Sequence, residues 1–132
     1  MASFSSVEEA EKFFTDDRFA VENGIVIDEL GEDWCVCSME IAPRHMNAGG
    51  IVNGGAVFTL ADFAAAVAWN NMHKYTVSQQ ASISFLRATR GKKLIARAQC
   101  RKEAKNSVFF DILVKDDLGA EIAQLTMIGC KL

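Results

Sequence analysis

The chain has 132 residues, of which 50% are hydrophobic and 23% are charged. This is the composition of one soluble globular domain, and the length leaves no room for two catalytic domains. A chain of this size buries roughly two thirds of the surface that it exposes when unfolded, so it needs no disulfide or structural metal to fold. We therefore expect residues 1–132 to form a single domain.

Charge and cysteine content exclude further classes of protein. The net charge of −3 gives no reason to expect nucleic-acid binding. The four cysteines form no CxxC pair and only two histidines accompany them, so we expect reduced thiols, a cytoplasmic protein and no metal site.

The longest uncharged stretch, residues 46–61, is too short and too polar to cross a membrane. The N-terminus lacks the basic region of a secretory signal.

The first third of the chain predicts a short helix followed by a β-hairpin. Residues 7–14 have helical spacing, with Ser6 as a candidate N-cap and Glu9 three residues later. Residues 24–30 and 34–41 are β-like runs that a Gly-Glu-Asp turn separates, which favours a hairpin.

Residues 56–69 predict a long helix. The run follows Gly54 and Gly55, is rich in alanine and is too long for a strand. It is apolar nearly all round, and Asp62 is its only charged residue. A helix of this kind is usually buried on most sides, so we expect it at the centre of the fold.

The second half of the chain alternates between polar and apolar residues, which predicts β-strands. We expect these strands to form an antiparallel meander, because the connections between them are too short for parallel crossovers. In the first strand, alternation predicts Ser78 on the face opposite to Ile83 and Phe85. The predicted fold class is α+β, with a curved antiparallel sheet wrapped around one long central helix. The four predicted strands are residues 77–86, 94–101, 108–115 and 121–131.

The predicted helix combines a glycine pair at its start with one carboxylate near its middle. The N–H groups at a helix N-terminus are unpaired and partly positive, and Gly54 and Gly55 let a substrate carbonyl approach the backbone. Apolar neighbours raise the pKa of a carboxyl group, which makes Asp62 a candidate acid or base. Two plainer interpretations stay open. Asp62 is a structural carboxylate bonded to a neighbour, or the glycines serve close helix packing.

Basic residues are concentrated in one part of the sequence. Eight of the 14 lysines and arginines fall between Arg87 and Lys105, where Glu103 is the only acid. They form a candidate phosphate-binding surface, and a solvent-facing pair of strands is the alternative interpretation.

Residues 45–62 carry a resemblance to a known family. The stretch His45-Met-Asn-Ala-Gly-Gly-Ile-Val-Asn-Gly-Gly-Ala-Val-Phe-Thr-Leu-Ala-Asp62 resembles the hotdog-fold thioesterases of the phenylacetic-acid-degradation (PaaI-like) type. Their pattern is His-x-Asn, a glycine, then His-Gly-Gly and Leu-x-Asp, and the similarity extends more weakly over nearly the whole chain. The resemblance implies an acyl-CoA thioesterase with the hotdog fold, in dimers that commonly pair into tetramers. It implies no metal or organic cofactor, because coenzyme A is part of the substrate.

The resemblance also implies roles for single residues. Asp62 attacks the thioester or activates the water, and the backbone N–H of Gly54, with Gly55, polarises the thioester carbonyl. Asn47 bonds near the carbonyl or the water, and Ser78 places a hydroxyl beside the water. A plain polar strand residue is the alternative for Ser78.

One position departs from the family pattern. Asn53 stands where the family has a histidine, and asparagine cannot act as an acid or base near neutral pH. His45 is retained, either as a substrate-binding residue of the loop or as a structural one. The phosphates of coenzyme A are expected at a cluster that the resemblance places at the pocket mouth, namely Arg87, Arg90, Lys92 and Lys93.

Three functions are therefore compared. Hydrolysis of an acyl-CoA thioester is favoured, because Asp62 and Asn47 are retained. A non-catalytic acyl-CoA-binding or regulatory domain is the alternative that Asn53 suggests. A hotdog dehydratase is weaker, because its histidine and acid pair has no counterpart.

Helix geometry adds an expectation about assembly. Gly54 and Asp62 are eight residues apart, so their backbones lie roughly 12 Å apart along one helix. Attack on a thioester needs the carboxylate or its water, and the oxyanion donor, within about 3 to 3.5 Å of the reacting atoms. We therefore expect an obligate dimer with two shared sites. Each would use Asp62 of one subunit with Asn47 and Gly54 of the other.

Overall fold

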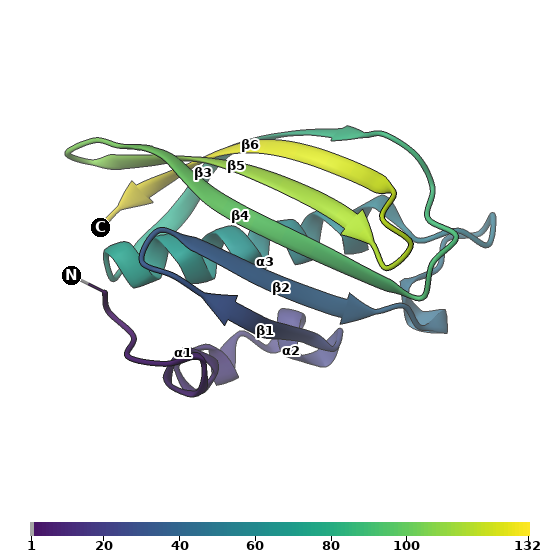
Figure 1. The fold of residues 1–132 in the computed structure, drawn as a ribbon, viewed down its shortest axis with the longest axis horizontal. Helices are drawn as coiled ribbons and strands as arrows, with labels where there is room; N and C mark the ends of the chain where they lie inside the picture. Colours follow the sequence, from purple (N-terminus) through teal and green to yellow (C-terminus); the bar gives the residue numbers. More distant parts are fainter. Residues whose placement is uncertain (1) are drawn as a thin grey trace.

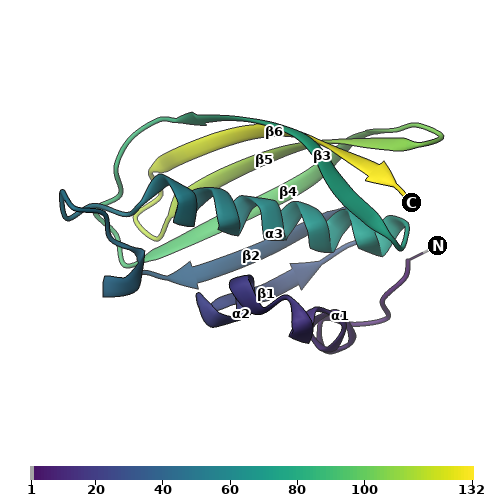
Figure 2. The ribbon, with the colours of Figure 1, turned by 180° about the vertical axis from the view of Figure 1, so that it is seen from behind.

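The computed structural model describes residues 2–132 and contains a six-stranded antiparallel sheet that curves around one long helix, α3 (Gly54–Met72) (Figure 1). Two shorter helices, α1 (Val7–Phe13) and α2 (Arg18–Glu22), pack against the first strand (Figure 2). The strand order is β1-β2-β4-β5-β6-β3. The strands are β1 (Ile25–Leu30), β2 (Trp34–Glu40), β3 (Thr76–Phe85), β4 (Lys93–Glu103), β5 (Ser107–Asp116) and β6 (Glu121–Lys131). The predicted α+β class with a hotdog arrangement is confirmed.

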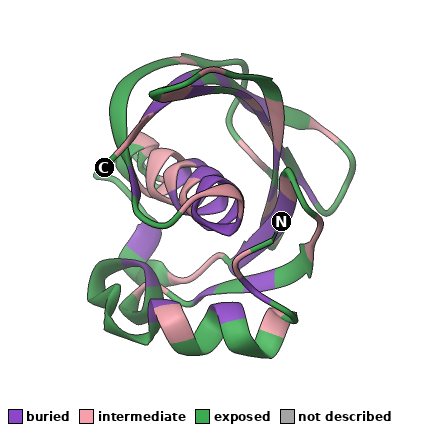
Figure 3. Cartoon of the chain, turned by 90° about the vertical axis from the view of Figure 1, so that its left-hand side faces the viewer, coloured by how far each residue is buried: buried purple, intermediate pink, exposed green. Residues whose placement is uncertain are grey.

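Helix α3 is the centre of the hydrophobic core, as its apolar sequence predicts. It begins at Gly54, because the Asn53 side chain accepts the Gly55 N–H at 2.7 Å and caps the first turn. Leu60, Ala64 and Trp69 are among its fully buried residues. Seen end-on, the helix lies inside the curve of the sheet (Figure 3). The sheet face towards the helix carries mainly small and aliphatic side chains, including those of β2 and β4, so the sheet can close around it.

The predicted four-stranded meander is only partly correct. Strands β4, β5 and β6 follow one another as antiparallel neighbours. Strand β3, however, pairs with β6 and not with β4. The connection at residues 86–92 passes the ends of the intervening strands, which puts β3 at one edge of the sheet (Figure 1). Short connections alone therefore do not show which strands are neighbours.

A β-bulge changes the predicted faces of β3. Ser78 pairs with Gly129 and Gln80 pairs with Ile128, so Gln79 is the extra residue. Residues directly opposite in an antiparallel pair share a face, and Ser78 therefore lies on the helix side together with Ile83 and Phe85. The expectation that Ser78 faces away from these two residues is wrong, because simple alternation does not count the bulge.

The two edges of the sheet differ in character. Strand β3 has ten residues without a charge or proline, and most of its side chains are exposed. Strand β1 has six residues, carries the exposed acids Asp28 and Glu29, and is interrupted by a bulge between Ile27 and Glu29. Charges and bulges hinder further strand pairing, so β1 is a protected edge and β3 is not.

The N-terminal segment follows the prediction at its start. The Ser6 hydroxyl accepts the Glu9 N–H at 3.1 Å and caps α1. A 3-10 turn at Phe14–Asp16 and helix α2, capped by Asp17, were not predicted. Within residues 2–132 no helix is long and apolar enough to span a membrane. All four cysteines are free thiols.

Candidate active site

Most of the residues predicted to act on substrate gather at one end of the molecule. The loop at residues 46–53 leads into the start of α3, and the connection at residues 86–92 leaves the end of β3 beside it (Figure 1). The turn between β5 and β6 lies at the same end. This places Asn47, Gly54 and the basic residues of the 86–92 connection in one region.

Asn47 organises the loop that precedes the helix. Its side-chain carbonyl accepts the N–H groups of Gly49 at 2.9 Å and Ile51 at 3.2 Å. The loop is closed by an isolated bridge between Met46 and Val52. Asn47 itself is exposed, and the oxygen bonds leave its amide NH₂ as the group that can donate to a ligand.

The first turn of α3 distinguishes the two candidate oxyanion donors. The Gly55 N–H is held by the Asn53 side chain at 2.7 Å, and the Ala56 N–H donates to the Asn53 carbonyl at 2.9 Å. The Gly54 N–H has no acceptor among residues 2–132. Gly54 is therefore the donor of this pair that a substrate carbonyl can use.

Asp62 lies on the side of α3 that the sheet leaves partly uncovered. Thr59, Asp62 and Ala66 share this stripe, and all three are half-buried. Burial raises the pKa of the Asp62 carboxyl above its ordinary value, and the nearby charge of Asp17 raises it further. In the described part of the chain no hydrogen bond or cation lowers it. This carboxyl is not held in a structural hydrogen bond within the chain, which favours a chemical role over the structural one.

Asp62 and Gly54 do not meet within one chain. Both belong to the same continuous helix, and eight residues of helix separate their backbones by roughly 12 Å. Ser78 lies on edge strand β3, where it is exposed on the helix side. One chain therefore offers the parts of a hydrolytic site at separate places.

His45 has a structural position. It is buried, its Nδ1 accepts the Ala42 N–H at 3.0 Å, and its Nε2 lies 3.0 Å from the Asn23 carbonyl. Both ring nitrogens are used by the backbone, so neither is left to bind a substrate.

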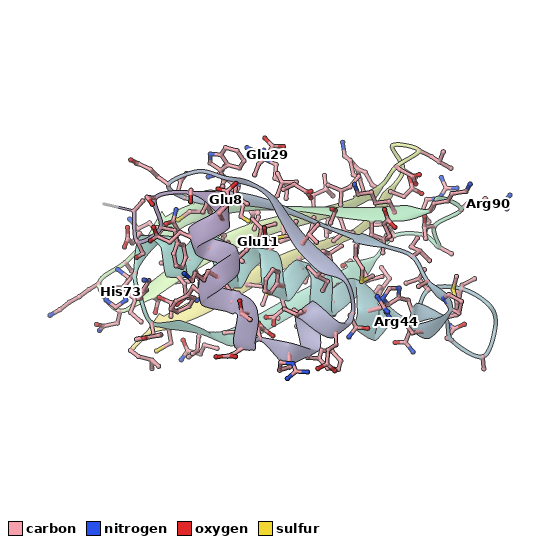
Figure 4. All side chains as sticks on the ribbon, turned by 90° about the horizontal axis from the view of Figure 1, so that it is seen from below. Glu8, Glu11, Glu29, Arg44, His73 and Arg90 are labelled. Atoms are coloured by element: carbon pink, nitrogen blue, oxygen red, sulfur yellow. The ribbon has the colours of Figure 1, made fainter. Side chains whose placement is uncertain are left out.

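The basic residues between 87 and 105 are divided between the two ends of β4. Arg87, Arg90 and Lys92 are exposed on the 86–92 connection, and Arg90 and Arg44 lie towards the same end of the molecule, away from His73 (Figure 4). The basic residues after position 100 lie at the other end, where Arg101 pairs with Asp111 at 3.0 Å. The basic residues that are close in the sequence therefore do not form one surface. Only the group on the 86–92 connection adjoins the candidate site.

Two acids of the β5–β6 turn hold the 86–92 connection in place. Asp117 accepts the N–H groups of Lys92 at 2.9 Å and Lys93 at 3.3 Å. Asp116 accepts the Thr89 hydroxyl at 2.7 Å. This hydroxyl bond is the main reason why the pKa of Asp116 lies below its ordinary value. The basic connection is thus fixed by acids that sequence reasoning did not single out, because about 25 residues separate the partners.

Among residues 2–132 no three His, Cys, Asp or Glu side chains form a group that could hold a metal ion. A hollow of about 730 Å³ lies over the strands and is lined by residues such as Ser82, Arg97 and Asp111, but none of the predicted site residues line it.

Comparison with known proteins shows the family of the chain. Residues 49–123 match the model of the thioesterase superfamily. The chain is 32% identical over 111 residues to the acyl-coenzyme A thioesterase PaaI of Escherichia coli, covering 83% of this chain and 79% of that protein. It is 35% identical over 72 residues to a putative esterase of Archaeoglobus fulgidus, but this match covers 54% of this chain and only 47% of the archaeal protein.

Solved structures show the same fold. The E. coli PaaI structure superposes with a TM-score of 0.89 and 27% identity, over 95% of this chain and 91% of that one. A hypothetical thioesterase protein from Streptococcus pneumoniae, solved with coenzyme A, has a TM-score of 0.83 at 20% identity, over 91% of this chain and 94% of that one. The chain therefore belongs to the thioesterase superfamily, and the predicted class of enzyme, a thioester hydrolase, is confirmed.

Proposed function

We propose that this protein hydrolyses acyl-CoA thioesters to the free acid and coenzyme A. The observation that carries the proposal is the half-buried carboxyl of Asp62, whose pKa is raised, on the uncovered side of a helix that begins with the available N–H of Gly54. The likeness to a named acyl-CoA thioesterase over most of the chain supports it. So does the S. pneumoniae protein of the same fold, which was solved with coenzyme A.

In the proposed reaction Asp62 acts as nucleophile or as general base. An oxygen from the carboxylate or from an activated water adds to the carbonyl carbon of the thioester. The Gly54 N–H donates to the oxyanion that forms, the carbon–sulfur bond breaks, and coenzyme A leaves as a thiolate that takes up a proton. In the nucleophilic route a water then hydrolyses the acyl–aspartyl anhydride, which gives the free acid and restores the carboxylate of Asp62. In this proposal the amide NH₂ of Asn47 and the hydroxyl of Ser78 bind the carbonyl or the water. No metal or organic cofactor takes part.

A complete site requires a second copy of the chain. Attack needs Asp62 close to a carbonyl held at Gly54, and these residues are too far apart on one helix. The bare edge of β3 and the partly uncovered stripe of α3 are the surfaces through which two copies would meet. We propose a homodimer with two shared sites, each using Asp62 of one subunit with Asn47 and Gly54 of the other. Pairing of two dimers into a tetramer stays a prediction.

The alternative is a protein that binds acyl-CoA without hydrolysing it. That interpretation came from Asn53, which replaces the family histidine. In the structure Asn53 caps α3 and fixes the turn in which Gly54 lies. The substitution therefore has a structural use that does not oppose hydrolysis, and hydrolysis is the function that we favour.

A panel of acyl-CoA esters of varied chain length, assayed by release of free thiol, tests the proposal. We expect turnover by the wild type, and a loss of about two to four orders of magnitude in Asp62→Asn, which is the usual scale for a positioned acid or base. Asp16→Asn is the matched control, because Asp16 is exposed and outside the site.

Saturable binding without turnover on every ester would favour the binding protein. Equal activity of wild type and Asp62→Asn would exclude Asp62 from the chemistry. Assays with an acylated carrier protein distinguish the two thiol carriers.

A further inference from the structure

A cavity of about 410 Å³ lies between α2, the 3-10 turn at Pro43–His45 and the first two turns of α3. Small-molecule sites commonly have volumes of about 300–1,000 Å³. Both Asn53 and Gly55 line this cavity, so it adjoins the turn in which Gly54 lies. A thioester whose carbonyl binds the Gly54 N–H would therefore have one of its two substituents beside the cavity.

The lining of the cavity is mainly apolar. Its aromatic and thioether side chains come from four different parts of the chain, namely Phe19, Met39, Met46 and Phe58. Met39 is buried, whereas Phe19 is 69% exposed. Methionine adapts to irregular apolar ligands. An exposed phenylalanine beside a cavity gains from a ligand that covers it, because apolar burial is favourable.

The polar groups of the cavity are already occupied. Both nitrogens of His45 bond to the backbone, and the Asn53 side-chain oxygen holds the Gly55 N–H. No carboxylate lines the cavity, and Arg44, which is exposed, is its one charged lining residue within the described chain. The cavity thus offers little to a ligand that needs many hydrogen bonds.

The two substituents of the thioester differ in chemistry, and this decides which one the cavity takes. The coenzyme A arm is polar and ends in phosphates, for which Arg87, Arg90 and Lys92 on the 86–92 connection are the basic partners at this end. These residues do not line the cavity. The acyl group is the apolar substituent, and the cavity matches it.

We propose that this cavity, the α2–α3 cavity, binds the acyl group of the substrate and selects for uncharged, apolar acyl chains. A cavity of about 150 Å³ lined by Leu, Ile and Phe is large enough for benzene, so the α2–α3 cavity accepts chains well beyond acetyl. Helix α2, which sequence reasoning missed, is thereby a specificity element. The inference rests on the proposed function, because it takes the acyl-CoA ester as the ligand.

The test measures binding separately from hydrolysis. S-alkyl-CoA thioethers cannot be hydrolysed, and their dissociation constants can be measured by calorimetry as the alkyl chain is lengthened. In the wild type we expect affinity to rise about three- to fourfold for each added CH₂ until the cavity is filled. Thr59→Phe places a ring in the cavity, and Phe19→Ala removes one of its apolar residues. Because Thr59 also lies on the α3 stripe at which two copies are proposed to meet, sedimentation must first show that Thr59→Phe has the same assembly as the wild type. We expect the gain per CH₂ to disappear in Thr59→Phe and to weaken in Phe19→Ala.

Tyr75→Ala is the matched control, because Tyr75 is 61% exposed and does not line the cavity. Its gain per CH₂ should equal that of the wild type. The same chain-length dependence in wild type and Thr59→Phe would overturn the cavity assignment, even if the protein hydrolyses acyl-CoA. Tighter binding of a carboxyalkyl than of an alkyl chain of the same length would overturn the selection for uncharged groups. A normal gain per CH₂ without any hydrolysis would support the cavity and refute the proposed function.

Discussion

The ring of Phe85 lies over Gly54, so that a β-carbon at position 54 would stand 3.0 Å from the ring's Cζ atom and 3.2 Å from its Cε1 atom. The two residues meet because β3 ends beside the start of α3 (Figure 2). Phe85 is 56% exposed although it lies on the helix side of the sheet. A side chain at position 54 would therefore press against this ring, in the turn that carries the Gly54 N–H.

This contact predicts the effect of Gly54→Ala. The added methyl group needs the Phe85 ring to move by a few tenths of an ångström, and we expect this strain to disturb the turn at which the carbonyl is proposed to bind. We expect kcat/KM to fall about 10- to 100-fold, less than the cost of losing an oxyanion donor outright, with little change in melting temperature. Adding Phe85→Ala should restore part of the activity. An unchanged kcat/KM in Gly54→Ala would show that the carbonyl does not bind at this turn.

The raised pKa of Asp62 predicts the acid limb of the pH–rate profile. The carboxyl must be ionised to act as nucleophile or base, so kcat/KM falls as the pH drops through its pKa. Since burial and Asp17 raise that pKa, the limb should lie above the ordinary aspartate value of about 3.9. Asp17→Asn removes one of the two causes, and its limb should move to lower pH. A limb that is unchanged in Asp17→Asn would contradict this electrostatic origin.

The same shift has a consequence for stability. A carboxyl with a higher pKa in the folded than in the unfolded state binds its proton more tightly when folded, so its ionisation costs folding free energy as the pH rises. Asp62→Asn cannot ionise and should therefore have a higher melting temperature than the wild type at neutral pH. Below the ordinary pKa of aspartate the two proteins should melt together. Calorimetric scans from acid to neutral pH measure this, and a lower melting temperature of Asp62→Asn at neutral pH would contradict it.

For Asp117, its charge and its hydrogen bonds predict opposite effects on phosphate binding. Removing its charge should strengthen phosphate binding if only net charge mattered, but its carboxylate also holds the N–H groups of Lys92 and Lys93. Because the loss of these bonds frees the 86–92 connection, we expect KM for acyl-CoA to rise about 3- to 10-fold in Asp117→Ala, with kcat unchanged. KM for an acyl-pantetheine ester, which lacks the nucleotide phosphates, should not change.

Asp111→Ala is the control for net charge, because Asp111 pairs with Arg101 away from the 86–92 connection. Its KM should match that of the wild type. Charge reversal by Arg90→Glu should raise KM for acyl-CoA far more than for the pantetheine ester. A lower KM in Asp117→Ala, or an equal effect of Arg90→Glu on both esters, would show that the phosphates bind elsewhere.

The shared site predicts complementation between inactive subunits. Asn47→Asp keeps the oxygen that bonds Gly49 and Ile51 but removes the NH₂ donor, and Asp62→Ala removes the carboxylate. After the two variants are unfolded and refolded together, half of the dimers are mixed and have one intact site, so about a quarter of wild-type activity should return. Verified mixed dimers without activity would require a site within one chain.

The sequence was sufficient for the six strands, for α1 and for the central helix, because these depend on local patterns, but not for α2. Alanine content and the Gly54-Gly55 start indicate α3, and Ser6 and Glu9 indicate the cap of α1. The pairing of β3 with β6 could not be predicted, since partners such as Phe85 and Ala123 are far apart in the chain. The face of Ser78 depends on a bulge that has no local signal of its own.

The candidate site, like the fold, was predicted only in part. Asp62 and Gly54 were singled out from the sequence of the helix itself, and Asn47 from the family resemblance; their catalytic roles stay predictions. The Phe85–Gly54 contact, the bonds from Asp117 and the α2–α3 cavity were missed, because each joins residues from separate elements. His45 matched the pattern, yet the fold uses both of its nitrogens for the backbone.

The difference between the two sheet edges limits how this protein can assemble. A chain with two bare edges can join β3 of one copy to β1 of the next without end, and such head-to-tail growth produces filaments. Here β1 is closed to such growth by Asp28, Glu29 and its bulge, and α1 and α2 pack beside it. Of the two edges β3 is left open, and in the proposed dimer it pairs with β3 of the second copy. Pairing between identical edges uses up both of them, so growth along the sheet stops at two chains.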